Sequence, residues 1–204
     1  MIVIVDYGMG NVGSVKNALA ALGQEAVISN RPEDIESATH LIVPGVGAFG
    51  DGMRNLQELG LIELLRRQVF EQKKPILGIC LGLQLFAERG EEGGQHSGLG
   101  WIPGVVRRFQ VDEKQYRVPH VGWNDVVTVG DQKFFSNIPS KVFYFVHSYF
   151  IVPQDPKTIV AYCDYGERFA AAIQHNNIFG VQFHPEKSQK SGLTLLYNFI
   201  SFSS

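Results

Sequence analysis

The first 80 residues alternate between short apolar runs and longer amphipathic segments, and this alternation limits the folds that the chain can adopt. Ile2–Val5 is a continuous apolar, β-branched run, which is typical of a strand buried on both faces of a parallel sheet. Similar runs follow at 26–28, 41–43 and 75–79. Apolar residues recur at helical spacing between these runs, as in 12–22 and 61–69. This order predicts an α/β fold built on an open, mostly parallel sheet with helices on both faces.

The second half of the chain has strand signals without long helices between them. The short apolar runs lie at 105–109, 126–129, 142–145, 159–162 and 170–173. Such runs predict an antiparallel extension of the sheet. A last buried strand is expected at 178–183, and a packing helix is expected to close the chain. The apolar face of that helix is Leu193, Leu196, Tyr197 and Ile200.

Length and composition predict a single domain that spans residues 1–204. The chain has 45% hydrophobic and 19% charged residues, without an internal repeat or linker, and about 150 residues is an ordinary domain length. Its two cysteines, Cys80 and Cys163, are not in a C-x-x-C pair, so a disulfide framework is not expected. The chain is long enough to bury a core without a structural metal.

Charge and hydropathy patterns argue against a nucleic-acid partner, a secreted protein and a membrane segment. The net charge is −2 and the basic residues are scattered, so nucleic-acid binding has little support. Neither a signal peptide nor an apolar run of roughly 18 residues is seen, which predicts a cytoplasmic protein without a membrane segment.

Two G-x-G-x-x-G patterns raise an NAD(P)-binding oxidoreductase as an alternative. The first, at 8–13, follows a strand and opens a helix, as the dinucleotide fingerprint requires. However, Asp6 would place a carboxylate near a bound pyrophosphate, and Ser29 and Asn30 stand where an acid is expected after the second strand. The second pattern lies in 44–52, where no helix is expected, so it predicts a flexible binding loop. These residues therefore predict that the protein uses no cofactor. Binding of a nicotinamide nucleotide would support the oxidoreductase alternative.

The segment Gly78-Ile79-Cys80-Leu81-Gly82 is a more specific signal. An apolar strand runs into Cys80 and a helix-like stretch, 83–88, follows. This G-x-C-x-G pattern is the thiol counterpart of the nucleophile elbow of hydrolases. A nucleophile on a sharp turn adopts strained backbone angles, and Cβ atoms at positions 78 and 82 would collide with neighbouring chain. The pattern predicts that Cys80 is a reactive thiol.

The same turn is expected to stabilise negative charge at Cys80 in two ways. It lies at the N-terminus of the predicted helix, where free N–H groups favour a thiolate. The N–H of Leu81 points into the same space, where it is placed to stabilise an oxyanion. A buried core cysteine is the alternative interpretation, and it is the one that we assign to Cys163, which has no such context.

A thiol hydrolase also needs a base, which is usually distant in sequence. His184 ends the last predicted strand and begins His184-Pro185-Glu186. Pro185 favours an extended backbone at His184, and residues two apart on an extended segment face the same side. Glu186 is therefore predicted to orient the imidazole while His184 faces the thiol. The histidines expected to be ordinary core or surface residues are His40, His96 and His175.

With both motifs, the chain resembles the class I, or triad, glutamine amidotransferases over essentially its whole length. The motifs are GICLGLQ around Cys80 and GVQFHPEKS at 180–188. The family has a flavodoxin-like sheet with flanking helices. Further segments resemble the glutaminase subunits of imidazole glycerol phosphate synthase, which act in histidine biosynthesis. They are DYGMGN at 6–11, PGVG at 44–47, HVGWN at 120–124 and HSY at 147–149.

The resemblance implies a mechanism. Cys80 attacks the carboxamide of glutamine and forms a glutamyl thioester, while His184, oriented by Glu186, protonates the departing ammonia. The positions that match the oxyanion hole are Leu81, Val46 and Gly47. Those that match the glutamine-binding residues are Gln84, Ser148 and Tyr149. Ser148 stands where the family usually has threonine, and it keeps the hydroxyl.

The resemblance also implies a heterodimer. The ammonia would pass to a (β/α)₈-barrel cyclase that forms imidazole glycerol phosphate and aminoimidazole carboxamide ribotide. The residues that resemble the partner-facing surface are Trp123, Asn124 and Asn11. A core tryptophan is the alternative for Trp123. We expect the 44–52 loop to complete the oxyanion hole only when the partner is bound. A glutaminase for pyridoxal phosphate or anthranilate synthesis would share the triad but not HVGWN.

Overall fold

A central sheet of eight strands organises the computed structural model, which describes residues 1–202. Five neighbouring strands are parallel: β2 (Ala26–Ser29), β1 (Ile2–Val5), β3 (His40–Gly45), β4 (Ile76–Cys80) and β14 (Ile178–Val181). This order is one of the two common doubly wound arrangements. The antiparallel strands that follow are β13 (Glu167–His175), β12 (Ile159–Tyr165) and β9 (Val127–Thr128). The predicted parallel sheet with an antiparallel extension is confirmed.

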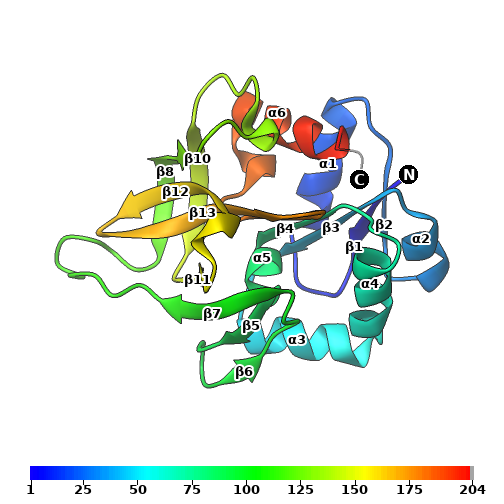
Figure 1. Ribbon diagram of the computed structural model, residues 1–204, viewed down its shortest axis with the longest axis horizontal. Helices are drawn as coiled ribbons and strands as arrows, with labels where there is room; N and C mark the ends of the chain where they lie inside the picture. The colour runs from blue at the N-terminus through cyan, green and yellow to red at the C-terminus, as the bar shows by residue number, and fades with distance from the viewer. Residues whose placement is uncertain (203–204) are drawn as a thin grey trace.

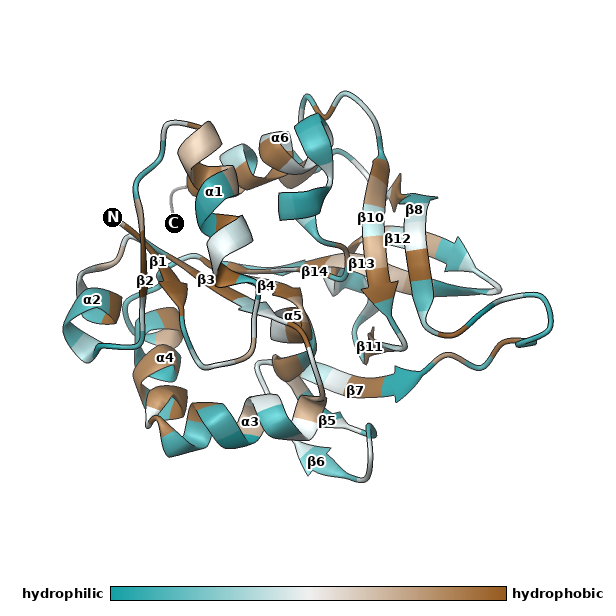
Figure 2. Cartoon of the chain, turned by 180° about the vertical axis from the view of Figure 1, so that it is seen from behind, coloured by the Kyte–Doolittle hydropathy of each residue, from teal (hydrophilic) through white to brown (hydrophobic). Residues whose placement is uncertain are grey.

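Helices cover both faces of the parallel strands (Figure 1). One face carries α1 (Val12–Ala21) and α6 (Gln189–Ile200). The other carries α2 (Pro32–Ser37), α3 (Phe49–Glu58) and α4 (Leu61–Phe70). Alternate side chains of a strand point to opposite faces, so Ile2 and Ile4 pack in the first core while Val3 and Val5 pack in the second. Figure 2 shows hydrophobic residues concentrated on the strands between these helices.

Two smaller sheets stand beside the main one. The first pairs β8 (His120–Asp125) with β10 (Val142–His147). The second contains β11 (Tyr149–Pro153), β7 (Ile102–Arg108), β5 (Ala87–Gly90) and β6 (His96–Ser97). Sequence patterns indicated strands only near β7 and β10. The strands β5, β6 and β8 are short or interrupted by glycine and charge, whereas β11 is a continuous apolar run that the sequence analysis missed. Within residues 1–202, no helix has the length and apolar character needed to cross a bilayer.

Two local expectations are wrong. The predicted flexible loop at 44–52 ends early, because α3 begins at Phe49. The glycines inside this helix allow close packing: a Cβ at Gly52 would lie 3.2 Å from the Leu85 side chain, and one at Gly50 would lie 2.7 Å from the His96 ring. The predicted helix at 83–88 also ends early, since α5 spans only Leu81–Leu85 and β5 begins at Ala87.

Candidate active site

Cys80 stands on the predicted elbow, between the end of β4 and the start of α5. Its backbone is strained, with φ 52° and ψ −107°. Gly78 has no room for a side chain, because a Cβ there would lie 2.6 Å from the backbone nitrogen of Leu83. A Cβ on Gly82 would overlap the carbonyl oxygen of Val43. The elbow is therefore fixed by backbone atoms of its neighbours.

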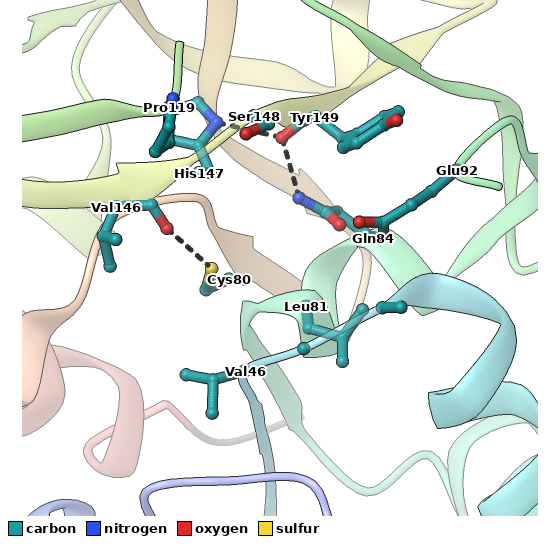
Figure 3. Close-up of a pocket in the computed structure, with 12 residues that line it drawn as sticks. Val46, Cys80, Leu81, Gln84, Glu92, Pro119, Val146, His147, Ser148 and Tyr149 are labelled. Atoms are coloured by element: carbon teal, nitrogen blue, oxygen red, sulfur yellow. Dashed lines mark hydrogen bonds between the residues drawn. The ribbon is translucent and has the colours of Figure 1, made fainter.

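The thiol of Cys80 has polar neighbours from two other elements. The sulfur Sγ lies 3.8 Å from the Val146 carbonyl oxygen (Figure 3) and accepts from the Gln182 amide at 3.6 Å. Gln84 Nε2 donates to Gln182 Oε1 at 3.1 Å, which turns the Gln182 NH₂ group toward the sulfur. Because α5 has five residues, its dipole contributes less than the sequence suggested. Sequence reasoning missed Gln182, although it lies two residues before His184 in the strand predicted at 178–183.

His184 and Glu186 form the predicted pair. His184 Nδ1 lies 2.8 Å from Glu186 Oε1, and the two side chains are 2% and 1% exposed. Burial lowers the pKa of His184, but its interactions with Cys80 and Glu186 outweigh burial and raise it to about 10. Among residues 1–202, His184 Nε2 has no hydrogen-bond partner. The ring is thus a cation whose free nitrogen is available beside Cys80.

The small β8–β10 sheet holds the base in place. The His184 N–H donates to the Tyr144 carbonyl at 2.8 Å. The Ser188 hydroxyl donates to the His184 carbonyl at 2.6 Å and accepts from the Tyr144 N–H at 3.0 Å. These bonds join β10 to the segment that follows β14, and they orient His184 from both sides.

A pocket of about 420 Å³ opens in front of Cys80. The residues predicted for the oxyanion hole and for glutamine binding all line it: Leu81, Val46, Gly47, Gln84, Ser148 and Tyr149. Gln84 Nε2 donates to the Tyr149 carbonyl at 2.8 Å (Figure 3). Since this nitrogen also serves Gln182, the Gln84 carbonyl oxygen is left to accept from a ligand.

Glu92 is a pocket residue that sequence reasoning missed. It lies between β5 and β6, and its Oε2 accepts from the N–H of Phe49 at 2.8 Å, at the start of α3. Among the described residues that line the pocket, Glu92 supplies the one carboxylate. A carboxylate in this place can pair with the ammonium of an amino acid. The acid-rich loop around it gave no signal that distinguished Glu92 from Glu91.

The loop after β3 does not present its backbone to Cys80. The Val46 N–H donates to the carbonyl of Met9 at 3.3 Å, and this bond turns it away from the thiol. Gly47 has φ 114°, and a Cβ there would lie 2.7 Å from the terminal carbon of Met9. The contribution predicted for the Val46 N–H therefore needs a different orientation of this peptide.

Two buried histidines, His147 and His120, lie beside the pocket and support Tyr149 in its wall. His147 Nδ1 lies 2.9 Å from the Tyr149 carbonyl oxygen, and His147 Nε2 lies 3.2 Å from His120 Nδ1. Burial lowers the pKa of His147 to about 3 and that of His120 to about 4, so both rings are neutral at pH 7. His147 Nδ1–H then donates to the carbonyl and Nε2 accepts from His120.

The three predicted interface residues differ in exposure. Trp123 is 49% exposed on the outer face of β8, next to Val121, so it is not a core residue. Asn124 is half-buried, and its amide donates to the Asp164 carbonyl at 3.1 Å. Asn11 lies at the start of α1, where its side-chain oxygen accepts from the Ser14 hydroxyl at 2.7 Å.

The glycine loop after β1 is filled by the chain itself. The Gly8 N–H donates to Asp6 Oδ1 at 3.2 Å, so it is not free for a phosphate. Gly10 packs on the next loop, where a Cβ would lie 3.3 Å from the Pro44 carbonyl oxygen. Within residues 1–202, no group of three or more His, Cys, Asp or Glu residues is placed to hold a metal ion.

Comparisons with known proteins agree with this geometry. A family model described as glutamine amidotransferase class-I matches residues 3–201. Imidazole glycerol phosphate synthase subunit HisH 2 from Methanococcus maripaludis is 49% identical over 98% of each chain. The protein of the same name from Pseudomonas aeruginosa is 48% identical, again over 98% of each chain. A solved structure described as glutamine amidotransferase has a TM-score of 0.76 at 21% identity over 98% of each chain, which shows the shared fold.

Proposed function

The chain belongs to the class-I glutamine amidotransferase family, and from this premise we propose that it is the glutaminase subunit of an imidazole glycerol phosphate synthase in histidine biosynthesis. The observation that carries the proposal is the Cys80 elbow, which lines the pocket and lies next to the buried His184–Glu186 pair. The relatives that share nearly the full length of the chain have that function in their names.

The chemistry follows from the positions of Cys80 and His184. The thiolate attacks the carboxamide carbon of glutamine, and the oxygen of the tetrahedral intermediate takes the negative charge. Charged His184 gives its Nε2 proton to the leaving nitrogen, so ammonia departs and a glutamyl thioester remains. Neutral His184 then takes a proton from the attacking water, and glutamate leaves as the thiolate is restored. Glu186 stabilises the imidazolium throughout.

The part of the pocket that is lined by Gln84, Glu92, Ser148 and Tyr149 suits the amino-acid end of glutamine. The Glu92 carboxylate and the free oxygen of Gln84 are acceptors for the α-ammonium group. Ser148 and Tyr149 line the same pocket with a hydroxyl and backbone groups for the α-carboxylate. An amino-acid substrate held here would point its side-chain amide down toward Cys80.

The outer face of the β8–β10 sheet suits a protein partner. Val121 and Trp123 are 56% and 49% exposed, and the Trp123 ring contacts Tyr144 across the strand pair. An exposed apolar patch with a tryptophan and a tyrosine is typical of an interface. We propose that the (β/α)₈-barrel cyclase binds this face and receives the ammonia. Binding there would act on the strand whose Tyr144 backbone holds His184.

The orientation of Val46 explains why the partner would be required. While the Val46 N–H is bonded to Met9, the oxyanion lacks this donor. Loss of one oxyanion donor typically lowers turnover by roughly 10²–10³-fold. We propose that partner binding reorients the loop and that turnover rises as a result.

The test is glutamine hydrolysis by wild type and by Cys80→Ala, each co-purified with the cyclase, with and without the cyclase substrate. Cys80→Ala should lose at least roughly 10³-fold of the stimulated rate, because the thioester cannot form. Cys163→Ala is the matched control. Burial, followed by the charges of Asp164 and Asp125, raises the pKa of the Cys163 thiol to about 12, so activity should persist without it. Hydrolysis that survives in Cys80→Ala would contradict the mechanism, and co-purification with a different synthase would contradict the pathway.

A further inference from the structure

Three buried side-chain polar atoms in residues 1–202 have no hydrogen-bond partner, and all belong to residues around the elbow: Tyr7 Oη, His184 Nε2 and Glu186 Oε2. Unpartnered buried groups are rare in folded proteins, and each calls for an explanation. His184 Nε2 is explained by proton transfer to and from substrate, and Glu186 Oε2 belongs to the carboxylate that stabilises the imidazolium. The hydroxyl of Tyr7 has no role in that mechanism.

The Tyr7 hydroxyl lies where the loop after β3 meets the elbow. The side chain is 1% exposed, and its hydroxyl occupies the space that a Cβ on Gly45 would fill. Gly45 pairs with Cys80 in the β3–β4 ladder, and the same missing Cβ would lie 2.8 Å from the Leu81 Cβ. Burial raises the pKa of Tyr7, and the charge of Cys80 raises it further, so the hydroxyl keeps its proton and remains a donor.

The peptide between Gly45 and Val46 has two faces. A trans peptide is planar, and its N–H and C=O point in opposite directions. The Val46 N–H now points to Met9, which packs in the same core as Tyr7, whereas Cys80 belongs to the core on the opposite face of the sheet. A rotation that turns the Val46 N–H toward Cys80 must turn the Gly45 carbonyl toward Met9 and Tyr7.

That rotation would leave two carbonyl oxygens, those of Gly45 and Met9, facing one another without a donor. An unmade buried hydrogen bond opposes such a state. Tyr7 supplies a proton donor beside Gly45 that is unused before the rotation.

We propose that Tyr7 is a positioning residue for the oxyanion loop, and that its hydroxyl donates to the Gly45 carbonyl when the Val46 N–H turns toward Cys80. This role rests on the proposed function, because it operates in the partner-stimulated state. It also accounts for a buried hydroxyl that is unpartnered in the free chain: its hydrogen bond forms only in the active arrangement.

The test is Tyr7→Phe in the complex with the cyclase. We expect the stimulated kcat for glutamine hydrolysis to fall about 10-fold, which corresponds to one lost hydrogen bond in the active arrangement. The KM for glutamine should stay within about 2-fold of wild type, because Tyr7 does not line the pocket. The urea midpoint of the free chain should be unchanged or higher, since no hydrogen bond is lost there.

Tyr165→Phe is the matched control. The Tyr165 hydroxyl donates to the Arg117 carbonyl at 2.9 Å, so its removal should lower the urea midpoint and leave the stimulated kcat unchanged. A Tyr7→Phe complex with the stimulated kcat of wild type would overturn the role of Tyr7 alone. A loss of kcat that is matched by a lower urea midpoint and a raised KM would show a structural role and overturn it as well. A wild-type complex without stimulation would overturn the proposed function, and the role of Tyr7 with it.

Discussion

The two glycine-containing turns that meet at the thiol, one after β4 and one after β3, differ in how firmly the fold holds them. At the elbow, side chains on Gly78 and Gly82 are excluded by backbone atoms of Leu83 and Val43, which cannot move aside. In the loop after β3, a Cβ on Gly47 would meet only the flexible end of the Met9 side chain. One hydrogen bond of 3.3 Å, from Val46 to Met9, fixes the adjacent peptide.

This difference separates two tasks within one active site. The nucleophile must stand at a fixed distance from its base, so the elbow is built against rigid backbone. The oxyanion donor is needed only when ammonia has a destination, so the loop can rest in another orientation. In the proposed function, a rigid thiol beside an adjustable donor would allow the chain to bind glutamine before hydrolysing it.

The largest expected effect contrasts Gly82→Ala with Gly47→Ala. The new Cβ at position 82 overlaps the Val43 carbonyl, so the unfolding free energy should fall by more than about 4 kcal/mol. At position 47 the cost should be about 1–2 kcal/mol, because φ is 114° but the Met9 side chain can move. Urea denaturation of both variants measures the difference. Equal losses would show that the two turns are held alike.

The next effect concerns the base, which belongs with the rigid elbow. In Glu186→Gln the stimulated kcat should fall roughly 100-fold, because the amide cannot stabilise the imidazolium. The pKa of His184 should fall as well, since Glu186 is one of the two groups that raise it. The pH dependence of kcat and titration of the His184 ring by NMR measure both changes. Glu63→Gln, at an exposed position of α4, is the control that should leave both unchanged.

A His184 ring that titrates in Glu186→Gln as in wild type would contradict this assignment. The base would then be held by Cys80 and the backbone of β10 alone. In that case the fixed part of the site would end at the elbow.

The smallest effect is a pH dependence of stability, and it concerns the neutral pair His120 and His147 beside the pocket. The pKa values of both histidines are lowered in the folded chain. Below pH 6.5, the ordinary pKa of histidine, the unfolded chain therefore binds more protons than the folded chain does. The stability that this pair contributes is complete above pH 6.5 and is lost as the pH falls toward 4 and 3. Between pH 7.5 and 5 the unfolding free energy should drop by about 2 kcal/mol, counting His147 alone.

Urea midpoints across this pH range measure that loss in wild type and in a double variant, His120→Asn with His147→Gln. The double variant should show a shallower pH dependence. His175→Gln, on the exposed end of β13, is the matched control and should keep the wild-type slope. A double variant with the wild-type slope would show that other groups cause the acid sensitivity.

The sequence alone determined the parts of this protein that depend on neighbours along the chain. Strand and helix periodicity predicted the parallel sheet, because burial on two faces forces continuous apolar runs. The framing of Cys80 by Gly78 and Gly82 predicted the elbow, since only glycine fits such a turn. The His-Pro-Glu motif predicted the His184–Glu186 pair, although the structure forms it through a 3₁₀ turn at Pro185–Lys187 and not through the extended segment that the prediction assumed. The expected helix at 83–88 and loop at 44–52 were wrong because packing, not propensity, set their ends.

Only the tertiary structure decided which distant groups meet. Gln182 reaches Cys80 across 102 positions, and Glu92 reaches Phe49 across 43. Such pairs depend on how the smaller sheets pack on the larger one, and no local pattern records that. The same holds for the Val46 N–H and the Tyr7 hydroxyl, since a peptide orientation and an unpartnered donor are properties of the packed site. The sequence therefore specified the proposed nucleophile and its proposed base, while packing decided whether the proposed oxyanion donor faces them.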